Sequence, residues 1–126
     1  MTDRPRILLV ESDPALRAAL KFSLELEGFA VEDHESGADV ADPAADCVVI
    51  DNRMEEGNGL ALLAALRRKG LSFPAIILAS NPTRAMSEAI EAAGARLVEK
   101  PLLCDALVAA IRSTLSARRQ NAFANH

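Results

Sequence analysis

Short apolar runs separated by helical patterns are the feature of this chain that most limits its fold. Four runs are nearly continuous: Ile7–Val10, Cys47–Ile50, Ala75–Ala79 and the weaker Leu97–Val98. A parallel strand covered on both faces requires such a pattern. A fifth run, Phe29–Glu32, alternates between apolar and polar residues, so it is expected nearer an edge of the sheet.

The segments between these runs carry helix signals. Asp13 before Pro14 is a natural N-cap before a first helical residue, and Gly28 is a natural stop. Further helices are expected over Gly59–Arg68, from Asn81 or Thr83 to about Ala93, from Leu103 to about Ala117, and as one short helix within Ser36–Ala45. Strand and helix thus alternate about five times, which predicts an α/β fold with a five-stranded parallel sheet and helices on both faces.

Length and charge limit the class of protein. A chain of 126 residues fits one domain, which we expect over residues 1–126, with a core of about 5–117 and a frayed tail over 118–126. The net charge of −4 and the absence of Trp and Tyr argue against nucleic acid or an anionic membrane as partner. No apolar stretch approaches the roughly 18 residues of a membrane-spanning helix, and the N-terminus lacks an apolar secretory core. We therefore expect a cytoplasmic protein.

Charged and polar side chains follow the expected strands, where the functional crevice of an open parallel sheet lies. They are Glu11, Ser12 and Asp13 after the first strand, Asp51 after the third, Ser80 after the fourth and Lys100 after the fifth. A cluster of carboxylates needs a proton or a cation, and oxygen ligands suit Mg²⁺. Next to a metal and an ammonium group, Asp51 is a credible nucleophile toward a phosphoryl group. Each residue also has a simpler interpretation when it is considered alone. Glu11 could be a solvated acid in a loop, Asp13 could serve only as an N-cap, and Lys100 could be a charged loop residue.

Five segments together resemble the receiver domain of response regulators in two-component signalling, over residues 5–117. They read ILLVESDP (7–14), VIDNRM (49–54), GNGL (57–60), FPAIIL (73–78) and EKP (99–101). The resemblance implies a flavodoxin-like (βα)5 fold and a phosphoacceptor rather than an enzyme. Asp51 would accept a phosphoryl group from a histidine kinase or phosphotransfer protein. Glu11 would belong to the acidic pocket, Arg53 would offer its backbone carbonyl to Mg²⁺, Lys100 would contact the phosphoryl group, and Pro101 would match the family's cis-proline.

The sequence departs from the family pattern at the metal site. The second of two adjacent acids after the first strand, a direct metal ligand in the family, is Ser12 here. We therefore expect a weakened Mg²⁺ site held by Glu11, Asp51 and the Arg53 carbonyl, with either Ser12 or Asp13 as a further candidate ligand.

The usual switch residues are also replaced. Ala79 stands where the family has Thr or Ser, Leu97 where it has an aromatic residue, and Glu55 where a proline is usual. Ser80 comes one residue late for the hydroxyl role and is the remaining candidate for a phosphoryl contact. With both switch residues missing, the response to phosphorylation is expected to stay near Asn52–Gly59 and the adjoining end of the first helix.

A stand-alone receiver of this kind would act through protein contacts, as a phosphate shuttle, a phosphate sink or a partner-binding regulator. It could also form a homodimer. The rival hypothesis is a pseudo-receiver that is never phosphorylated and serves only for interaction. A haloacid-dehalogenase-like phosphatase is disfavoured because it needs a second acid where Arg53 stands. A flavodoxin-like cofactor binder is disfavoured because the loop after the first strand is acidic.

The first helix also has an apolar flank, at Ala15, Phe22 and Leu26. This flank either docks a partner helix pair or packs against the last helix.

Overall fold

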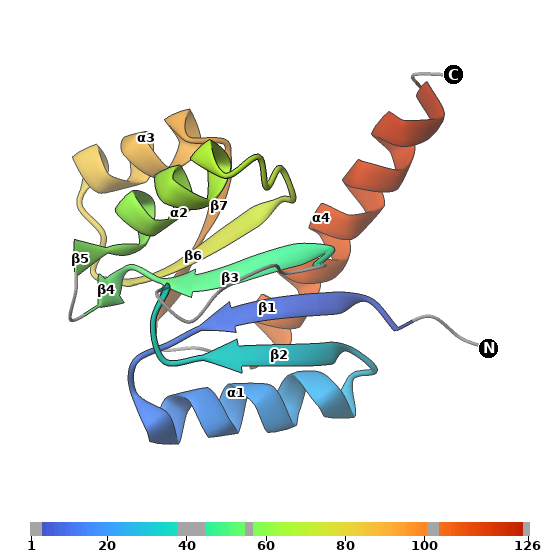
Figure 1. The fold of residues 1–126 in the computed structure, drawn as a ribbon, viewed down its shortest axis with the longest axis horizontal. Coiled ribbons are helices and arrows are strands. Elements are labelled where there is room, and N and C mark those ends of the chain that lie inside the picture. The colour runs from blue at the N-terminus through green and yellow to red at the C-terminus, as the bar shows by residue number, and fades with distance from the viewer. Residues whose placement is uncertain (1–3, 38–44, 55–56, 101–103, 125–126) are drawn as a thin grey trace.

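One parallel sheet forms the centre of the molecule in the computed structural model, which describes residues 4–37, 45–54, 57–100 and 104–124 (Figure 1). Its strands are β1 (Arg6–Val10), β2 (Ala30–His34), β3 (Cys47–Asp51), β6 (Ala75–Ser80) and β7 (Ala95–Lys100). They lie in the order β2-β1-β3-β6-β7, and every neighbouring pair is parallel. The predicted α/β fold is confirmed, and the alternating run near residue 30 does form an edge strand.

Helices cover both faces of this sheet because successive strand residues point to opposite sides. On one face, side chains of β1, β3 and β6 form a buried cluster with α1 (Pro14–Leu26) and α4 (Cys104–Ala124), and its members include Ile7, Leu9, Leu20, Leu24, Val49, Leu107 and Ile111. On the other face they pack with α2 (Gly59–Arg68) and α3 (Arg84–Ala92), and members include Leu8, Val10, Ile50, Leu63, Leu66, Ile77 and Ile90. The continuous apolar runs thus fill two cores at once.

Local signals set the ends of α1 as predicted. The Asp13 carboxylate accepts hydrogen bonds from the backbone N–H groups of Ala15 and Leu16, at 2.9 and 3.3 Å, so Asp13 is the N-cap. At the other end Gly28 adopts φ of 96°, and the Phe29 N–H turns back to the Leu24 carbonyl oxygen at 3.1 Å. The buried Phe29 then leads the chain into β2.

Several boundaries differ from the predictions. β7 runs over Ala95–Lys100 rather than Leu97–Val98, because an edge strand exposes residues such as Arg96 and Glu99 that interrupt the apolar run. α4 continues to Ala124, so the expected end of this helix near Ala117 was wrong; alanine, arginine and glutamine in that stretch favour a helix. Fraying of residues 118–126 stays a prediction. Of the two candidate starts for α3, Thr83 is the N-cap.

A small antiparallel pair, β4 (Arg53–Met54) with β5 (Gly57–Asn58), was not predicted, since strands of two residues carry no periodicity. It follows directly after Asp51 and leads into α2. Two expectations fall outside the described residues: most of the short helix within Ser36–Ala45, and the peptide bond at Pro101.

Candidate phosphoacceptor site

Three charged side chains from three strands meet at the carboxyl edge of the sheet. Asp51 ends β3, Lys100 ends β7, and Glu11 follows β1 directly. The register aligns these strand ends, because Val10 pairs with Ile50 across β1 and β3. They line one cavity of about 370 Å³ together with Ser12, Asp13, Leu16 and Arg53. The convergence predicted from the sequence is therefore present in the fold.

Lys100 pairs with both carboxylates. Its Nζ lies 2.6 Å from Asp51 Oδ2 and 3.8 Å from Glu11 Oε1, while the exposed fractions of the two acidic side chains are only 6% and 1%. The interpretations of Glu11 as a solvated loop acid and of Lys100 as an unpaired loop residue were therefore wrong. Charges buried this deeply are tolerated only when they are paired or neutralised.

The pKa values of the two buried acids shift in opposite directions. Burial raises the pKa of the Glu11 carboxyl from 4.5 to about 7, and its hydrogen bond with Asp51 acts in the same direction. Burial alone would also raise the pKa of Asp51, but hydrogen bonds from Glu11, Lys100 and the Arg53 N–H together lower that pKa. Asp51 is therefore the ionised member, and Glu11 carries a proton through much of the neutral range.

Backbone contacts hold these side chains in place. The Arg53 N–H donates to Asp51 Oδ1 at 3.0 Å, and the Asp13 N–H donates to Glu11 Oε2 at 3.2 Å. Gly59, the first residue of α2, packs against the same loop: a Cβ there would lie 3.1 Å from both the Asp51 carbonyl oxygen and the Asn52 Cα. A side chain at position 59 would thus be crowded where α2 meets the end of β3.

The donor set is compatible with Mg²⁺, which is commonly bound by one or two carboxylates and retained waters. Glu11 Oε1 is buried and has no hydrogen-bond partner among the described residues, although Lys100 Nζ lies 3.8 Å from it as an ion-pair partner. Asp13, in contrast, is exposed and its side chain caps α1. Within the described residues, no group of three or more His, Cys, Asp or Glu side chains could hold a metal ion. Binding of an ion by Glu11, Asp51 and the Arg53 carbonyl, with Ser12 or Asp13 as a further ligand, therefore stays a prediction.

The two replaced switch positions, Ala79 and Leu97, contribute no polar side-chain atom to this site. Ala79 is buried at the end of β6, and Leu97 is half-buried on β7. Ser80 has an exposed side chain and is not among the residues that line the cavity. Its role as a phosphoryl contact remains a prediction.

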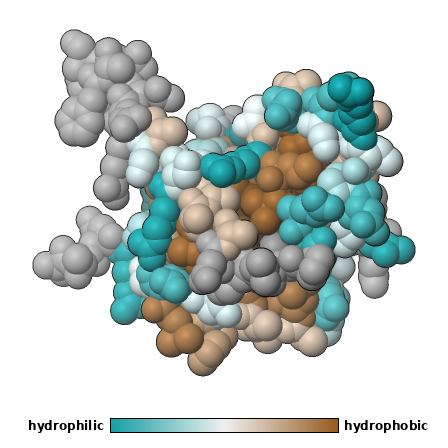
Figure 2. All heavy atoms as spheres, turned by 180° about the vertical axis from the view of Figure 1, so that it is seen from behind, coloured by the Kyte–Doolittle hydropathy of each residue, from teal (hydrophilic) through white to brown (hydrophobic). Residues whose placement is uncertain are grey.

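The apolar flank of α1 is exposed. Phe22 and Leu26 have exposed fractions of 66% and 73%, whereas Leu20 and Leu24 carry the buried contact with α4. Brown side chains lie along the lower edge of the molecule in Figure 2, the edge along which α1 runs in Figure 1. Packing of Phe22 and Leu26 against the last helix, one of the two interpretations above, was therefore wrong.

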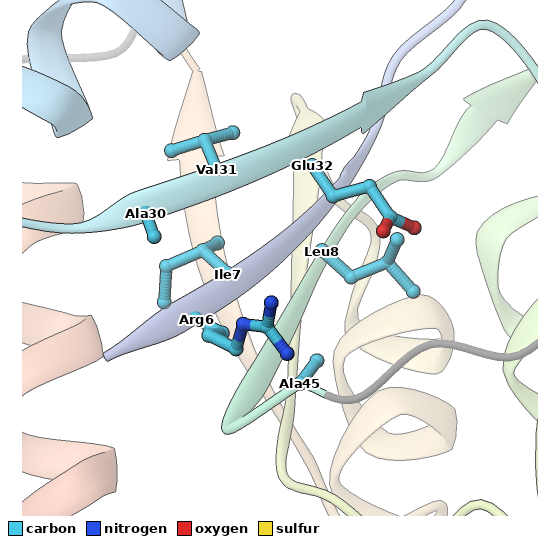
Figure 3. Close-up of a pocket in the computed structure, with 7 residues that line it drawn as sticks. All are labelled: Arg6, Ile7, Leu8, Ala30, Val31, Glu32 and Ala45. Atoms are coloured by element: carbon cyan, nitrogen blue, oxygen red, sulfur yellow. The ribbon is translucent and has the colours of Figure 1, made fainter. Parts of the chain in front are cut away.

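Other hollows lack a comparable set of groups. One of about 120 Å³, shown in Figure 3, lies over the amino ends of β1 and β2 and is lined by Arg6, Ile7, Leu8, Ala30, Val31, Glu32 and Ala45. Its volume is below the roughly 300 Å³ typical of small-molecule sites. Another, of about 480 Å³, lies at the amino ends of β6 and β7 and has Arg67 and Arg96 among its lining residues. Among the described hollows, only the cavity at the carboxyl edge of the sheet is lined by both acidic side chains and a lysine.

Comparison with known proteins agrees with this geometry. The model of the response regulator receiver domain matches residues 7–112. That match covers most of the chain, and the chain belongs to this family of two-component signalling proteins. Receiver domains are phosphoacceptors and generally bind Mg²⁺ at their acidic site.

Curated relatives are regulators of greater length. The transcriptional regulatory protein FixJ of Azorhizobium caulinodans is 33% identical over 112 residues, which make up 85% of this chain and 53% of FixJ. The response regulator MprA of Mycobacterium sp. is 31% identical over 115 residues, or 87% of this chain and 50% of MprA. The chain thus spans about half the length of these relatives.

Solved structures of receiver domains superpose closely. The non-phosphorylated HemR receiver domain of Leptospira biflexa has a TM-score of 0.81 at 28% identity, covering 90% of this chain and 95% of that domain. A CheY-like receiver domain protein of Methanospirillum hungatei has a TM-score of 0.86 at 22% identity, covering 94% and 99%. Separately, none of the described helices combines the length and apolar character needed to cross a membrane.

The raised pKa of Glu11 makes stability depend on pH. Between its ordinary value of 4.5 and about 7, the folded state keeps a proton that the unfolded state has lost. The free energy of unfolding should therefore fall as pH rises through that window, by up to about 3 kcal/mol. Urea unfolding at pH 5 and pH 8 without Mg²⁺ measures the fall, and Glu11→Gln should remove most of it. An unchanged slope in Glu11→Gln would contradict this assignment.

Proposed function

We propose that this protein is a receiver that accepts a phosphoryl group on Asp51 from a histidine kinase or phosphotransfer protein. The observation that carries the proposal is the ion pair of Lys100 with Asp51, 2.6 Å long, at the mouth of a cavity bordered by Glu11. Membership of the receiver family supports the same chemistry.

The residues present suit transfer of a phosphoryl group. An oxygen of the ionised Asp51 carboxylate attacks the phosphorus, the bond from phosphorus to the donor histidine breaks, and the histidine nitrogen keeps its electron pair. Lys100 is within reach of both carboxylates and would balance charge on the transferring oxygens. When bound, Mg²⁺ would supply further positive charge next to the same oxygens. Glu11, Asp51 and the Arg53 carbonyl would hold it.

The partner would bind along α1. The amino end of this helix borders the cavity through Asp13 and Leu16, and Phe22 and Leu26 are exposed further along. Two large apolar side chains on one helix suit the apolar face of a helix pair in a kinase or phosphotransfer protein. The expectation that nucleic acid is not a partner stays a prediction, as does a homodimer.

A pseudo-receiver that only binds partners remains the second candidate function. The replacements at Ser12 and Ala79 favour it, since a neutral hydroxyl stands where the receiver family has a carboxylate and a methyl group where it has a hydroxyl. Retention of the buried Glu11, Asp51 and Lys100 favours phosphorylation. The following experiments separate the two.

Asp51 should be the single phosphorylated residue. Incubation with Mg²⁺ and acetyl phosphate, or with a phosphorylated partner kinase, should give a base-labile adduct that mass spectrometry places on Asp51. Asp51→Asn should show none. An adduct on Asp13 or Glu56, or no adduct under any of these conditions, would overturn the proposal.

Restoring the second acid should strengthen the metal site. Ser12 lines the cavity and is half-buried, so Ser12→Asp adds a carboxylate beside Glu11 and Asp51. Mg²⁺ affinity, measured by titration, should tighten by about tenfold, which corresponds to roughly 1.4 kcal/mol. Ser113→Asp adds the same charge at an exposed position of α4 and should not change the affinity. Equal affinities in Ser12→Asp and the wild type would show that the metal does not bind here.

The exposed flank of α1 should govern transfer from a protein donor. Phe22→Ser should slow phosphotransfer from the partner by about tenfold, because an apolar contact worth roughly 1.4 kcal/mol is lost. Glu25→Gln, at an exposed position of the same helix, serves as the matched control. Acetyl phosphate has no surface with which to dock on α1, so its reaction should be alike in both variants. Unimpaired transfer to Phe22→Ser would rule out this docking surface.

A further inference from the structure

The residue after the phosphoacceptor reaches a helix on the far side of the site. Asn52 Nδ2 lies 3.6 Å from the sulfur of Met86, which is 34 positions along the chain, in the first turn of α3. Met86 itself is partly buried and packs against the core between the sheet and α2 and α3. This contact joins the phosphorylation loop to α3 directly.

The Asn52 backbone is tied in place while its side chain is poorly paired. Its N–H donates to the Leu78 carbonyl oxygen at 2.8 Å, and its own carbonyl accepts from the Gly59 N–H at 3.1 Å. The side-chain amide has a thioether sulfur, which is a weak acceptor, as the partner of its nitrogen. Its Oδ1 is buried and has no donor among the described residues. A buried side-chain amide with one weak hydrogen bond and one unpaired acceptor oxygen costs free energy. Any rearrangement that offers it better hydrogen-bond partners would therefore stabilise the protein.

We infer that the Asn52–Met86 contact couples the state of Asp51 to α3, in place of the hydroxyl and aromatic switch that Ala79 and Leu97 cannot provide. This inference rests on the proposed phosphorylation of Asp51. A phosphoryl group adds a charge of nearly two units to the residue before Asn52 and competes for the Lys100 and Arg53 contacts that now hold Asp51. Rearrangement of that loop moves the Asn52 amide relative to Met86. The two states therefore differ in a contact to α3, as a conformational response requires.

Methionine methyl groups give a direct readout, because the chain has 3 methionines and α3 contains one of them, Met86. The protein is labelled with ¹³C in its methionine methyls, and Mg²⁺ with beryllofluoride serves as the phosphoryl probe. Fluorine NMR reports whether the probe binds at Asp51, and Met86→Leu assigns the Met86 signal. The Met86 signal should shift on binding, and Asn52→Ala should reduce that shift at least twofold.

Two further variants keep the test decisive if Asn52→Ala folds poorly. Met86→Leu preserves apolar packing but removes the sulfur, so the backbone amide response of Arg84–Ala92 should fall at least twofold. Glu88→Gln, an exposed change on the same helix, should leave that response unchanged.

The outcomes separate the two proposals. Bound beryllofluoride without a shift of Met86, or a shift that persists in Asn52→Ala, overturns the coupling while the phosphoacceptor function stands. A shift that is lost in Ser80→Ala but kept in Asn52→Ala assigns the coupling to Ser80 instead. Absence of any bound probe in the fluorine spectrum overturns the proposed function and the coupling with it.

Discussion

The ion pair between Lys100 and Asp51 is the contact on which the site depends. Both groups stand at the ends of parallel strands, and the strand between them, β6, sets their separation through its register with β3 and β7. Burial alone would raise the pKa of Asp51, and Lys100 acts with the hydrogen bonds from Glu11 and the Arg53 N–H to lower it and keep the nucleophilic carboxylate form. The arrangement of strands thus makes the chemistry possible, and the two apolar cores maintain that arrangement.

Charge balance at the site involves a proton as well as the lysine. When Glu11 holds its proton, the charges of Asp51 and Lys100 cancel. Glu11 and Asp51 would hold Mg²⁺ as carboxylates, so the metal would compete with the proton on Glu11. Ser12 adds no charge to this competition, whereas an acid at that position would favour the metal.

The sequence was sufficient to predict the features that depend on order and periodicity. Near-continuous apolar runs located the inner strands, and the strand-end rule placed Glu11, Asp51 and Lys100 together. It was insufficient where tertiary context decides. The polar residues Arg96 and Glu99 concealed the length of the edge strand β7, and the β4–β5 pair is too short to carry a pattern. The protonation of Glu11 depends on burial, and the Asn52–Met86 contact depends on side-chain placement across 34 positions. Neither can be read from residue types alone.

The length of α1 also sets the size of the contact surface that a phosphoryl donor docked along it would need. The helix rises 1.5 Å per residue, so about 18 Å separate Pro14, beside the cavity, from Leu26 at the far end. A donor that docks along α1 as proposed, touching Leu26 while presenting its phosphoryl group to Asp51, needs a contact surface at least that long. A short loop would reach one end of α1 and miss the other. The length of this helix would therefore limit the shape of a docked partner before any individual side chain acts on its chemistry.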